Sequence, residues 1–192
     1  MKTDIVLAGV GGQGILSIAA TIGMAALQND LFLKQSEVHG MSQRGGAVQS
    51  HMRVSDKPIA SDLIPQGSAD LILSVEPMES LRYLSFLNKD GWLVTNITPF
   101  INIPNYPELD VIMKEVEAQP NFVALDADKI AAEVATKRAS NIVMLGAASP
   151  FINIPFENFE KGLQAIFGRK GEDVVNMNIA ALRAGREVSD NR

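Results

Sequence analysis

The chain of 192 residues contains no cysteine and only two histidines, His39 and His51. Without cysteine it can form no disulfide, present no thiolate nucleophile and ligate no iron–sulfur cluster through thiolates. With two imidazoles and no thiolate, we expect no zinc site of the usual kind. We therefore expect metal and thiol chemistry to lie outside this chain.

Surplus positive charge and long apolar runs are also missing. Lys and Arg number 17 against 22 Asp and Glu, a net charge of −5, whereas a surface that binds nucleic acid needs excess cations. No apolar run approaches the roughly 20 residues of a membrane span, and no secretory signal is clear. We expect a cytoplasmic protein that binds neither nucleic acid nor membrane.

Length and composition indicate one globular domain. The hydrophobic content is 46%, and 192 residues are enough to bury a sizeable core. No repeat, low-complexity tract or linker divides the chain. We predict a single domain over residues 1–192.

The most informative motif is the glycine-rich segment 9–14, GVGGQG, directly after the apolar run 4–8. We predict a strand that ends in a tight turn and then opens a helix. Such a turn exposes backbone N–H groups at the positive end of the helix dipole (about half a unit charge), which favours a bound phosphate or carboxylate. Its spacing fits G-x-G-x-x-G. Alternatively, the glycines only permit close packing of strand and helix.

Hydrophobic periodicity predicts alternating strands and helices. The expected helices are 12–28, 76–87, 110–118, 128–136, 141–148, 156–167 and 173–188, and the expected strands are 4–8, 31–35, 47–54, 70–75, 91–96 and 121–126. The first strand, helix and second strand predict a β-α-β unit with a parallel strand pair. The fold class is α/β: a Rossmann-like three-layer fold with a mostly parallel, mixed sheet and a helical C-terminal third.

Two segments have sequence patterns typical of surfaces that are buried against another part of the chain or against a partner. Strand 47–54 alternates, with Gln49, His51 and Arg53 on one face that we expect to be wet or covered by a partner, as on an antiparallel or edge strand. Helix 141–148 is apolar almost throughout and is therefore buried or covered by a partner. Both segments are candidates for an interface with another subunit or within a homodimer.

A second glycine-rich segment, 36–46, lacks periodicity and is predicted to be a loop. Its Arg44 carries a planar guanidinium that suits phosphate or carboxylate. Gly45 and Gly46 let a ligand or another backbone approach closely. The alternative is an ordinary turn with a solvated Arg44.

Four segments are expected to meet at the carboxyl ends of the parallel strands, where α/β sheets bind ligands. They are residues 11–14, residues 37–46, Glu76 and Asn96. We predict a site at this edge of the sheet.

Few residues fit a catalytic pattern. No Walker lysine follows the glycine turn and no G-x-S-x-G elbow occurs, which argues against an NTPase or a serine hydrolase. Glu37, 23 residues after Gly14, could hold a ribose, but a glycine loop and an alternating strand follow it where a dinucleotide-binding domain has a second helix. The chain therefore looks like one part of a larger enzyme, and the alternative is a stand-alone nucleotide- or dinucleotide-binding regulatory module.

Three motifs carry a resemblance to a known family. Residues 9–15, 37–46 and 141–146 read GVGGQGI, EVHGMSQRGG and NIVMLG, in that order. Together they resemble the small, gamma-type subunit of the 2-oxoacid:ferredoxin oxidoreductases, over nearly the whole chain and most closely its indolepyruvate branch. The resemblance implies a holoenzyme that oxidatively decarboxylates a 2-oxoacid, here indolepyruvate or another aryl pyruvate, to an acyl-CoA and reduces ferredoxin.

The resemblance also implies where the cofactors and partners lie. Thiamine diphosphate, Mg²⁺ and iron–sulfur clusters belong to a large partner subunit, without which this chain is inactive, and ferredoxin is reached through the holoenzyme. Coenzyme A could bind at a site shared with that partner. By the same resemblance, seven residues are expected at the edge that faces the ligand or the partner subunit: Gly11, Gly12, Gln13, Gly14, Arg44, Gly45 and Gly46. No catalytic or metal-binding residue is expected in this chain.

Overall fold

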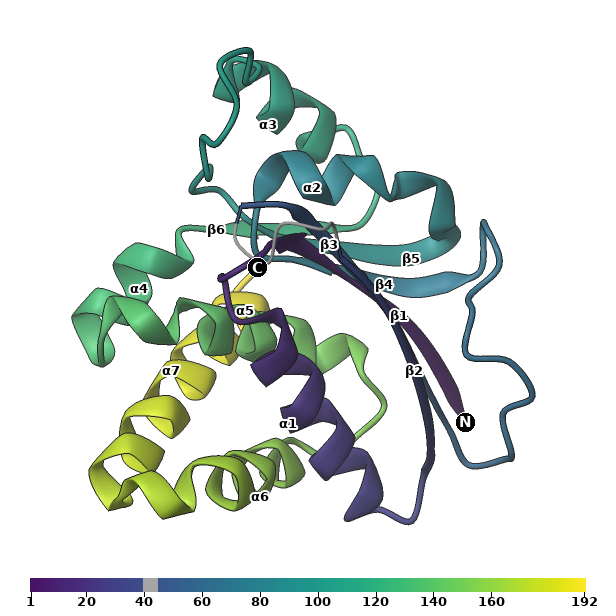
Figure 1. The fold of residues 1–192 in the computed structure, drawn as a ribbon, viewed down its shortest axis with the longest axis vertical. Helices are drawn as coiled ribbons and strands as arrows, with labels where there is room; N and C mark the ends of the chain where they lie inside the picture. Colours follow the sequence, from purple (N-terminus) through teal and green to yellow (C-terminus); the bar gives the residue numbers. More distant parts are fainter. Residues whose placement is uncertain (40–44) are drawn as a thin grey trace.

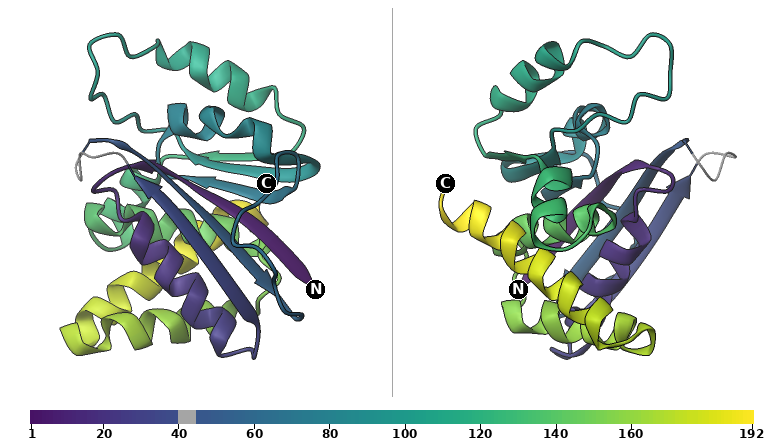
Figure 2. Two further views of the ribbon diagram at one scale, coloured as in Figure 1. Left: turned by 45° about the vertical axis from the view of Figure 1, so that its right-hand side comes forward. Right: turned by 90° about the vertical axis from the view of Figure 1, so that its left-hand side faces the viewer.

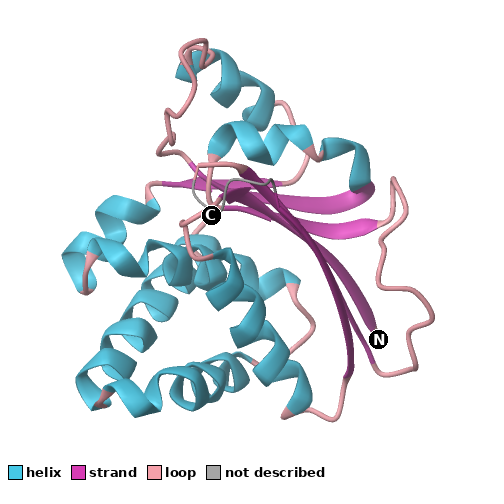
Figure 3. Cartoon of the chain, in the orientation of Figure 1, coloured by secondary structure: helices cyan, strands magenta, loops and turns pink. Residues whose placement is uncertain are grey.

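A six-stranded mixed sheet lies between two layers of helices in the computed structural model, which describes residues 1–39 and 45–192 (Figures 1 and 3). The strands are β1 (Lys2–Val10), β2 (Phe32–His39), β3 (Ala47–Ser55), β4 (Ala69–Ser74), β5 (Leu87–Asn96) and β6 (Phe122–Leu125). Their spatial order is β2-β3-β1-β4-β5-β6. The strands β1, β4, β5 and β6 are parallel, whereas β3 is antiparallel to both β1 and β2. The predicted mostly parallel, mixed sheet is confirmed.

The helices are divided unequally between the two faces of the sheet. They are α1 (Ile15–Leu27), α2 (Pro77–Arg82), α3 (Leu109–Glu117), α4 (Ala127–Val134), α5 (Ser140–Ala148), α6 (Phe156–Phe167) and α7 (Glu172–Asp190). Figures 1 and 2 show α2 and α3 on one face, here called the upper face, and the other five on the lower face. The three layers and the helical C-terminal third are as predicted.

The predicted β-α-β unit with a parallel strand pair is wrong. The strand after α1 pairs with β3, and β3 lies between it and β1, so β2 and β3 form an antiparallel hairpin at the edge of the sheet. Residues 36–39, predicted as part of a loop, continue β2 and pair with β3 as far as His39 opposite Val48. The loop prediction relied on the polar composition of the segment, but an edge strand tolerates polar residues on its solvated side.

Helix α2 is shorter than predicted. It ends at Arg82, and the predicted last turn is instead a short 3₁₀ helix (Leu84–Phe86) that leads directly into β5 at Leu87. Leu87 pairs with Ala69 at the start of β4. Pairing with the sheet therefore overrides the helical spacing of the leucines.

Helix α5 is buried by this chain's own helices, so its apolar sequence needs no partner to cover it. Every residue from Asn141 to Ala148 is buried, chiefly against α7. A Cβ atom on Gly146 would lie 2.0 Å from the carbonyl oxygen of Leu182, and one on Gly185 would lie 1.9 Å from that of Val143. The two helices thus approach backbone to backbone, which only glycine allows.

The polar face of β3 is also covered by this chain, so the prediction of a wet or partner-covered face is wrong for His51 and Arg53. The guanidinium of Arg53 donates to Asp4 (2.8 and 3.0 Å) and to the carbonyls of Ser61 and Leu63. His51 Nδ1 accepts from the N–H of Ile64 (3.0 Å). Segment 56–68 is therefore hydrogen-bonded over this face of β3.

Within the part of the chain that the structure describes, no helix combines the length and the apolar character needed to cross a bilayer.

Candidate functional site

The glycine turn joins the central strand β1 to the start of α1. Gly14 caps the helix with a left-handed backbone (φ 83°), and a Cβ there would lie 2.5 Å from Asn141 Nδ2. Asn141 in turn donates to the Gly14 carbonyl (3.0 Å). The positive φ and the short distance to Asn141 both exclude a residue with a side chain at position 14. Gly14 is therefore required for close packing, which was the alternative explanation of this motif.

The same turn exposes donors. No acceptor among residues 1–39 and 45–192 is found for the N–H groups of Gly14, Ile15 and Leu16, the first turn of α1, as expected for a helix N-terminus. Gln13 holds the turn in place: its Oε1 accepts from the N–H of Val10 (2.8 Å), and its Nε2 donates to the carbonyl of Val75 (3.4 Å). The turn is thus a preformed array of donors at the positive end of a helix.

The second glycine segment meets the first, as predicted. The N–H of Gly11 donates to the carbonyl of Gly46 (2.8 Å), and the N–H of Gly45 donates to that of Gly11 (3.2 Å). Asn102 Nδ2, from the long segment between β5 and α3, donates to the Gly45 carbonyl. Arg44 lies outside the described residues.

Glu76, the third residue predicted to lie at the carboxyl edge of the sheet, has a structural role: its carboxylate is buried and is not accessible to a ligand. Its carboxylate is fully buried and caps α2 by accepting from the N–H of Glu79 (2.8 Å). The other oxygen accepts from the N–H of Phe100 (3.3 Å) and from the Tyr106 hydroxyl. Burial and this hydrogen bond raise the pKa of Tyr106 above its usual value. Through these hydrogen bonds, Glu76 holds segment 97–108 against the carboxyl ends of the parallel strands.

Asn96, the fourth member, is the last residue of β5 and its side chain binds the first turn of α4. Its Oδ1 accepts from the N–H groups of Thr98 (3.3 Å) and Ala127 (3.1 Å), while its Nδ2 donates to Asp128 (3.1 Å). Glu37, weighed as a ribose ligand, pairs with Ser50 of β3, which in turn pairs with Leu7 of β1. It lies two strands from β1, roughly 10 Å at the usual strand spacing, so the arrangement of a dinucleotide-binding domain is not formed.

Two hollows flank the glycine turn. The smaller, of about 400 Å³, is lined by Gln13, Val75, Asn96, Thr98, Pro99, Phe100, Asp128, Lys137 and Ser140. The larger, of about 770 Å³, lies between the turn and the N-terminal ends of α5 and α7, and is lined by Gly12, Gln13, Gly14, Ser17, Thr136, Lys137, Arg138, Ala139, Ser140, Asn141, Phe167, Lys170, Val174, Met177 and Asn178. Gln13, Lys137 and Ser140 belong to both.

Sequence reasoning missed the cations of the larger hollow. Lys137 and Arg138 are adjacent in the chain, but two neighbouring basic residues are a weak signal. Lys170, just before α7, joins them because α7 packs against α5. No sequence pattern pairs residue 170 with residue 138.

The chain is similar to known proteins over almost its full length. The profile of the family "Pyruvate ferredoxin/flavodoxin oxidoreductase" matches residues 4–188. The indolepyruvate oxidoreductase subunit IorB of Archaeoglobus fulgidus is 36% identical over 194 residues, which span 96% of this chain and 94% of the relative. The corresponding subunit of Thermococcus kodakarensis is 41% identical over 190 residues, spanning 95% and 93%.

A solved structure has the same fold. The 2-oxoglutarate:ferredoxin oxidoreductase from Magnetococcus marinus, with 2-oxoglutarate, coenzyme A and succinyl-CoA bound, matches all of this chain with a TM-score of 0.78 at 21% identity. The match covers 31% of that longer chain. This match shows the fold alone. The family match and the two relatives confirm the resemblance that the three sequence motifs predict: the chain belongs to the pyruvate ferredoxin/flavodoxin oxidoreductase family.

Proposed function

We propose that this chain is the small subunit of an oxidoreductase that oxidatively decarboxylates indolepyruvate or another aryl pyruvate to an acyl-CoA, with ferredoxin as the electron acceptor. The observation that carries the proposal is identity of 36–41% to two indolepyruvate oxidoreductase subunits along more than nine-tenths of the chain. Residues 1–192 form one domain of this subunit.

The redox chemistry belongs to a large partner subunit. In this proposal that subunit carries thiamine diphosphate and Mg²⁺, as the family resemblance implies. It also carries the iron–sulfur clusters, since this chain has no cysteine to ligate one. When bound, the thiamine supplies the carbanion chemistry of decarboxylation. Ferredoxin is reached through the holoenzyme, and the complex works in the cytoplasm.

This chain contributes part of the coenzyme A site. The residues proposed to face the coenzyme are Gly11, Gly12, Gln13, Gly14, Arg44, Gly45 and Gly46. The N–H groups at the start of α1, for which residues 1–39 and 45–192 offer no acceptor, suit the oxygens of a diphosphate, and an arginine fork adds charged hydrogen bonds. Two observations support this position: the donors at the start of α1, and the contact that brings Gly45 and Gly46 to Gly11.

The test is purification from the native host under anaerobic conditions through a tag on this chain, followed by assay with 2-oxoacids. We expect a near-stoichiometric large subunit with clustered cysteines and a thiamine motif, and turnover of aryl pyruvates that depends on coenzyme A and ferredoxin. A chain that arrives alone and binds a nucleotide tightly would instead favour a stand-alone regulatory module.

Arg44→Ala in the same complex tests the coenzyme site. The expected result is a KM for coenzyme A raised about tenfold with little change in kcat, since a charged hydrogen bond is lost. Arg169→Ala, which removes an exposed arginine outside both hollows, is the control and leaves both constants unchanged. An unchanged KM in Arg44→Ala would remove Arg44 from the site.

A further inference from the structure

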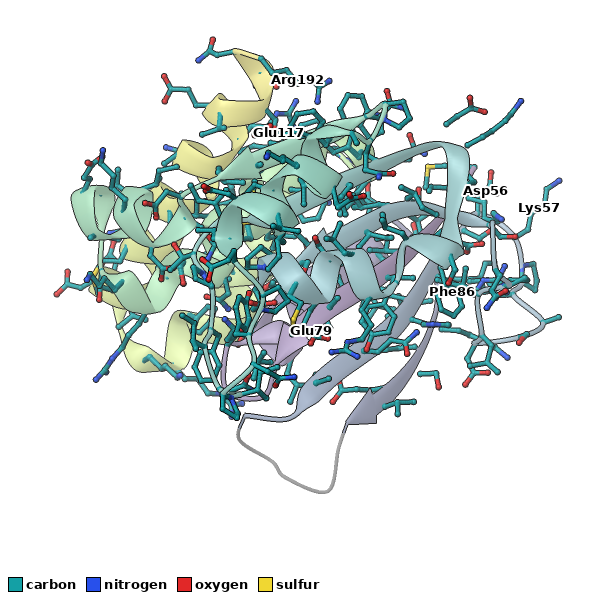
Figure 4. The ribbon with its side chains drawn as sticks, turned by 90° about the horizontal axis from the view of Figure 1, so that it is seen from above. Asp56, Lys57, Glu79, Phe86, Glu117 and Arg192 are labelled. Atoms are coloured by element: carbon teal, nitrogen blue, oxygen red, sulfur yellow. The ribbon has the colours of Figure 1, made fainter. Side chains whose placement is uncertain are left out.

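The two edges of the six-stranded sheet differ in how they are protected from pairing with another chain. At one edge, β6 has only four residues, and such a short strand offers little template for a further strand. At the other edge, β2 has eight residues and pairs with β3 without a break in register. In the view from above (Figure 4), β2 and β3 lie along the side of the molecule opposite Arg192. The strand β2 is therefore the edge that can accept a further strand.

The outward-facing backbone groups of β2 have no strand to bind. Among residues 1–39 and 45–192, no strand pairs with the outer side of β2, and no backbone N–H of β2 donates outside its ladder with β3. The strand contains no proline and no β-bulge, which are two common protections of an edge. Its one lysine, Lys34, donates to the carbonyl of Ala60 (3.0 Å). The ammonium is thus held over the upper face and does not block the edge.

Two apolar side chains are exposed on one face of β2. Leu33 faces α1 on the lower side, because a Cβ on Gly23 would lie 3.2 Å from its Cδ2 atom. Successive side chains of a strand alternate between its faces, so Phe32 and Val38 face the upper side. They are 47% and 65% exposed. A long edge strand with exposed apolar side chains is a surface that pairs with another strand.

We propose that β2 pairs antiparallel with β2 of a second copy of this chain, about a two-fold axis that passes through Gln35 perpendicular to the sheet. This axis keeps the upper faces of both copies on the same side. Phe32 of each copy then lies opposite Val38 of the other, with Cα atoms about 4.5–5.5 Å apart, so that each covers the other. Lys34 lies opposite Ser36, and no two like charges are directly opposed. An axis at Ser36 would instead place Lys34 opposite Val38 and leave Phe32 without an apolar partner.

A second copy fits this edge better than a strand of another protein, because the pattern of β2 is complementary to itself. A two-fold contact uses the same surface on both copies, as this register does. The strand β2 is parallel to β1, since β3 is antiparallel to both. Two antiparallel copies of β2 therefore point the two glycine turns in opposite directions. Each copy keeps its glycine turn free for its own large partner subunit, whichever 2-oxoacid the enzyme oxidises.

Disulfide trapping in the assembled complex tests this register. The chain has no cysteine of its own, so every disulfide between two copies must come from introduced residues. Gln35→Cys places a cysteine opposite its own copy across the axis, and Phe32→Cys with Val38→Cys creates an opposed pair. Phe32→Cys alone is the control. Its two copies would be separated by the distance from residue 32 to residue 38, roughly 20 Å, which is too far for a disulfide.

Non-reducing electrophoresis after mild oxidation measures the covalent dimer of this chain, at twice 20.7 kDa. We expect Gln35→Cys and the double variant to give at least about tenfold more dimer than Phe32→Cys, because only they bring sulfur atoms within disulfide distance. Equal yields in the three variants, or no dimer in any of them, would overturn the proposal. A disulfide between Gln35→Cys and the large subunit would also contradict it, since another chain would then cover β2.

A charge variant gives a second measurement on the background of Gln35→Cys. Phe32→Lys with Val38→Lys opposes two cations at each end of the strand pair, and should lower the yield of dimer at least about tenfold. Leu27→Lys with Val111→Lys adds the same charge on α1 and α3, at positions that are 60% and 56% exposed, and should leave the yield unchanged. An equal fall in both variants would show that net charge, and not strand pairing, controls the cross-link.

This test is separate from that of the proposed function. A complex that oxidises no aryl pyruvate contradicts the proposed function, whereas the yield of the covalent dimer reports only on the pairing of β2.

Discussion

The helices and connections on the two faces of the sheet are stabilised by different kinds of interaction. The lower face is a continuous apolar core made by β-strand side chains with α1 and α4 to α7, and α5 meets α7 with glycine against backbone. The upper face has a small apolar cluster under α2 and α3. Around that cluster, buried polar groups fasten the long connections: Asp4 with Arg53, His51 with Ile64, and Glu76 with Tyr106.

This difference has a physical meaning. Close packing on the lower face depends on volume and shape, so we expect its stability to respond to single methyl groups and to be indifferent to pH. Buried charges on the upper face depend on their partners and on protonation. Two long connections lie on this face, residues 56–68 and 97–108. Hydrogen bonds to buried polar side chains, and not apolar burial alone, hold them in place. Four changes test the contrast.

The largest effect is expected from Asp4→Ala on the upper face. The Asp4 side chain is fully buried, and Arg53 is 16% exposed, so the change leaves a largely buried guanidinium without its carboxylate. We expect a loss of about 3–5 kcal/mol in the free energy of unfolding, measured by urea titration. The double variant Asp4→Leu with Arg53→Met removes both charges and should recover most of the loss. A loss below about 1 kcal/mol would show that the pair behaves like a surface ion pair.

The next effect is expected from Gly185→Ala on the lower face. The added Cβ would lie 1.9 Å from the Val143 carbonyl oxygen, so α5 and α7 must separate. We expect about 1–3 kcal/mol of destabilisation from overpacking, equal at pH 6 and pH 8. Gly168→Ala is the control, because a Cβ there meets nothing within 4 Å. Equal stability of the two variants would mean that α7 shifts freely.

Tyr106→Phe should have a smaller, local effect. It removes the hydroxyl that donates to the buried carboxylate of Glu76, at a cost of about 1 kcal/mol. We expect faster amide exchange within segment 97–108, with β1 and β4 unchanged. Tyr83→Phe provides the comparison, since no hydrogen bond of its hydroxyl is found within residues 1–39 and 45–192. Uniform loss of protection across the sheet would contradict a local role.

The smallest effect is a dependence of stability on pH through His51. Burial lowers the pKa of His51 below its usual value, so the unfolded chain binds a proton at a pH where the folded chain does not. The stability that neutral His51 contributes is complete above the unfolded pKa of about 6.5. It is lost as the pH falls through the folded pKa. The urea midpoint should therefore fall less between pH 7.5 and pH 5 in His51→Gln than in the parent; parallel curves would contradict this.

The sequence predicted the class of the fold and the edge at which the two glycine segments meet, because these depend on local signals. Alternation and apolar runs located the six strands, and the glycines located the turn that receives Gly45 and Gly46. It did not predict that β3 separates β2 from β1, since two strands of similar polarity pair equally well with several neighbours. Nor did it show that α7 covers α5, because the fit of Gly146 and Gly185 exists only in three dimensions.

Of the candidate site, the sequence predicted the two glycine segments but not the residues that line the larger hollow beside them. Gly11 to Gly14 have a sequence pattern because one turn needs all of them. The cations of the larger hollow come from two short 3₁₀ helices about thirty residues apart, and Asn178 reaches it from α7. Such a cavity is a product of packing, so no local pattern marks it.

The hydrogen bond from Asn141 to the Gly14 carbonyl joins residues 127 positions apart. The glycine turn is thus synthesised well before α5, yet it receives one of its supporting hydrogen bonds only after α5 has been synthesised. Early nascent chains have the donors of the turn but lack that support. The supported form of the turn should therefore be acquired late in synthesis.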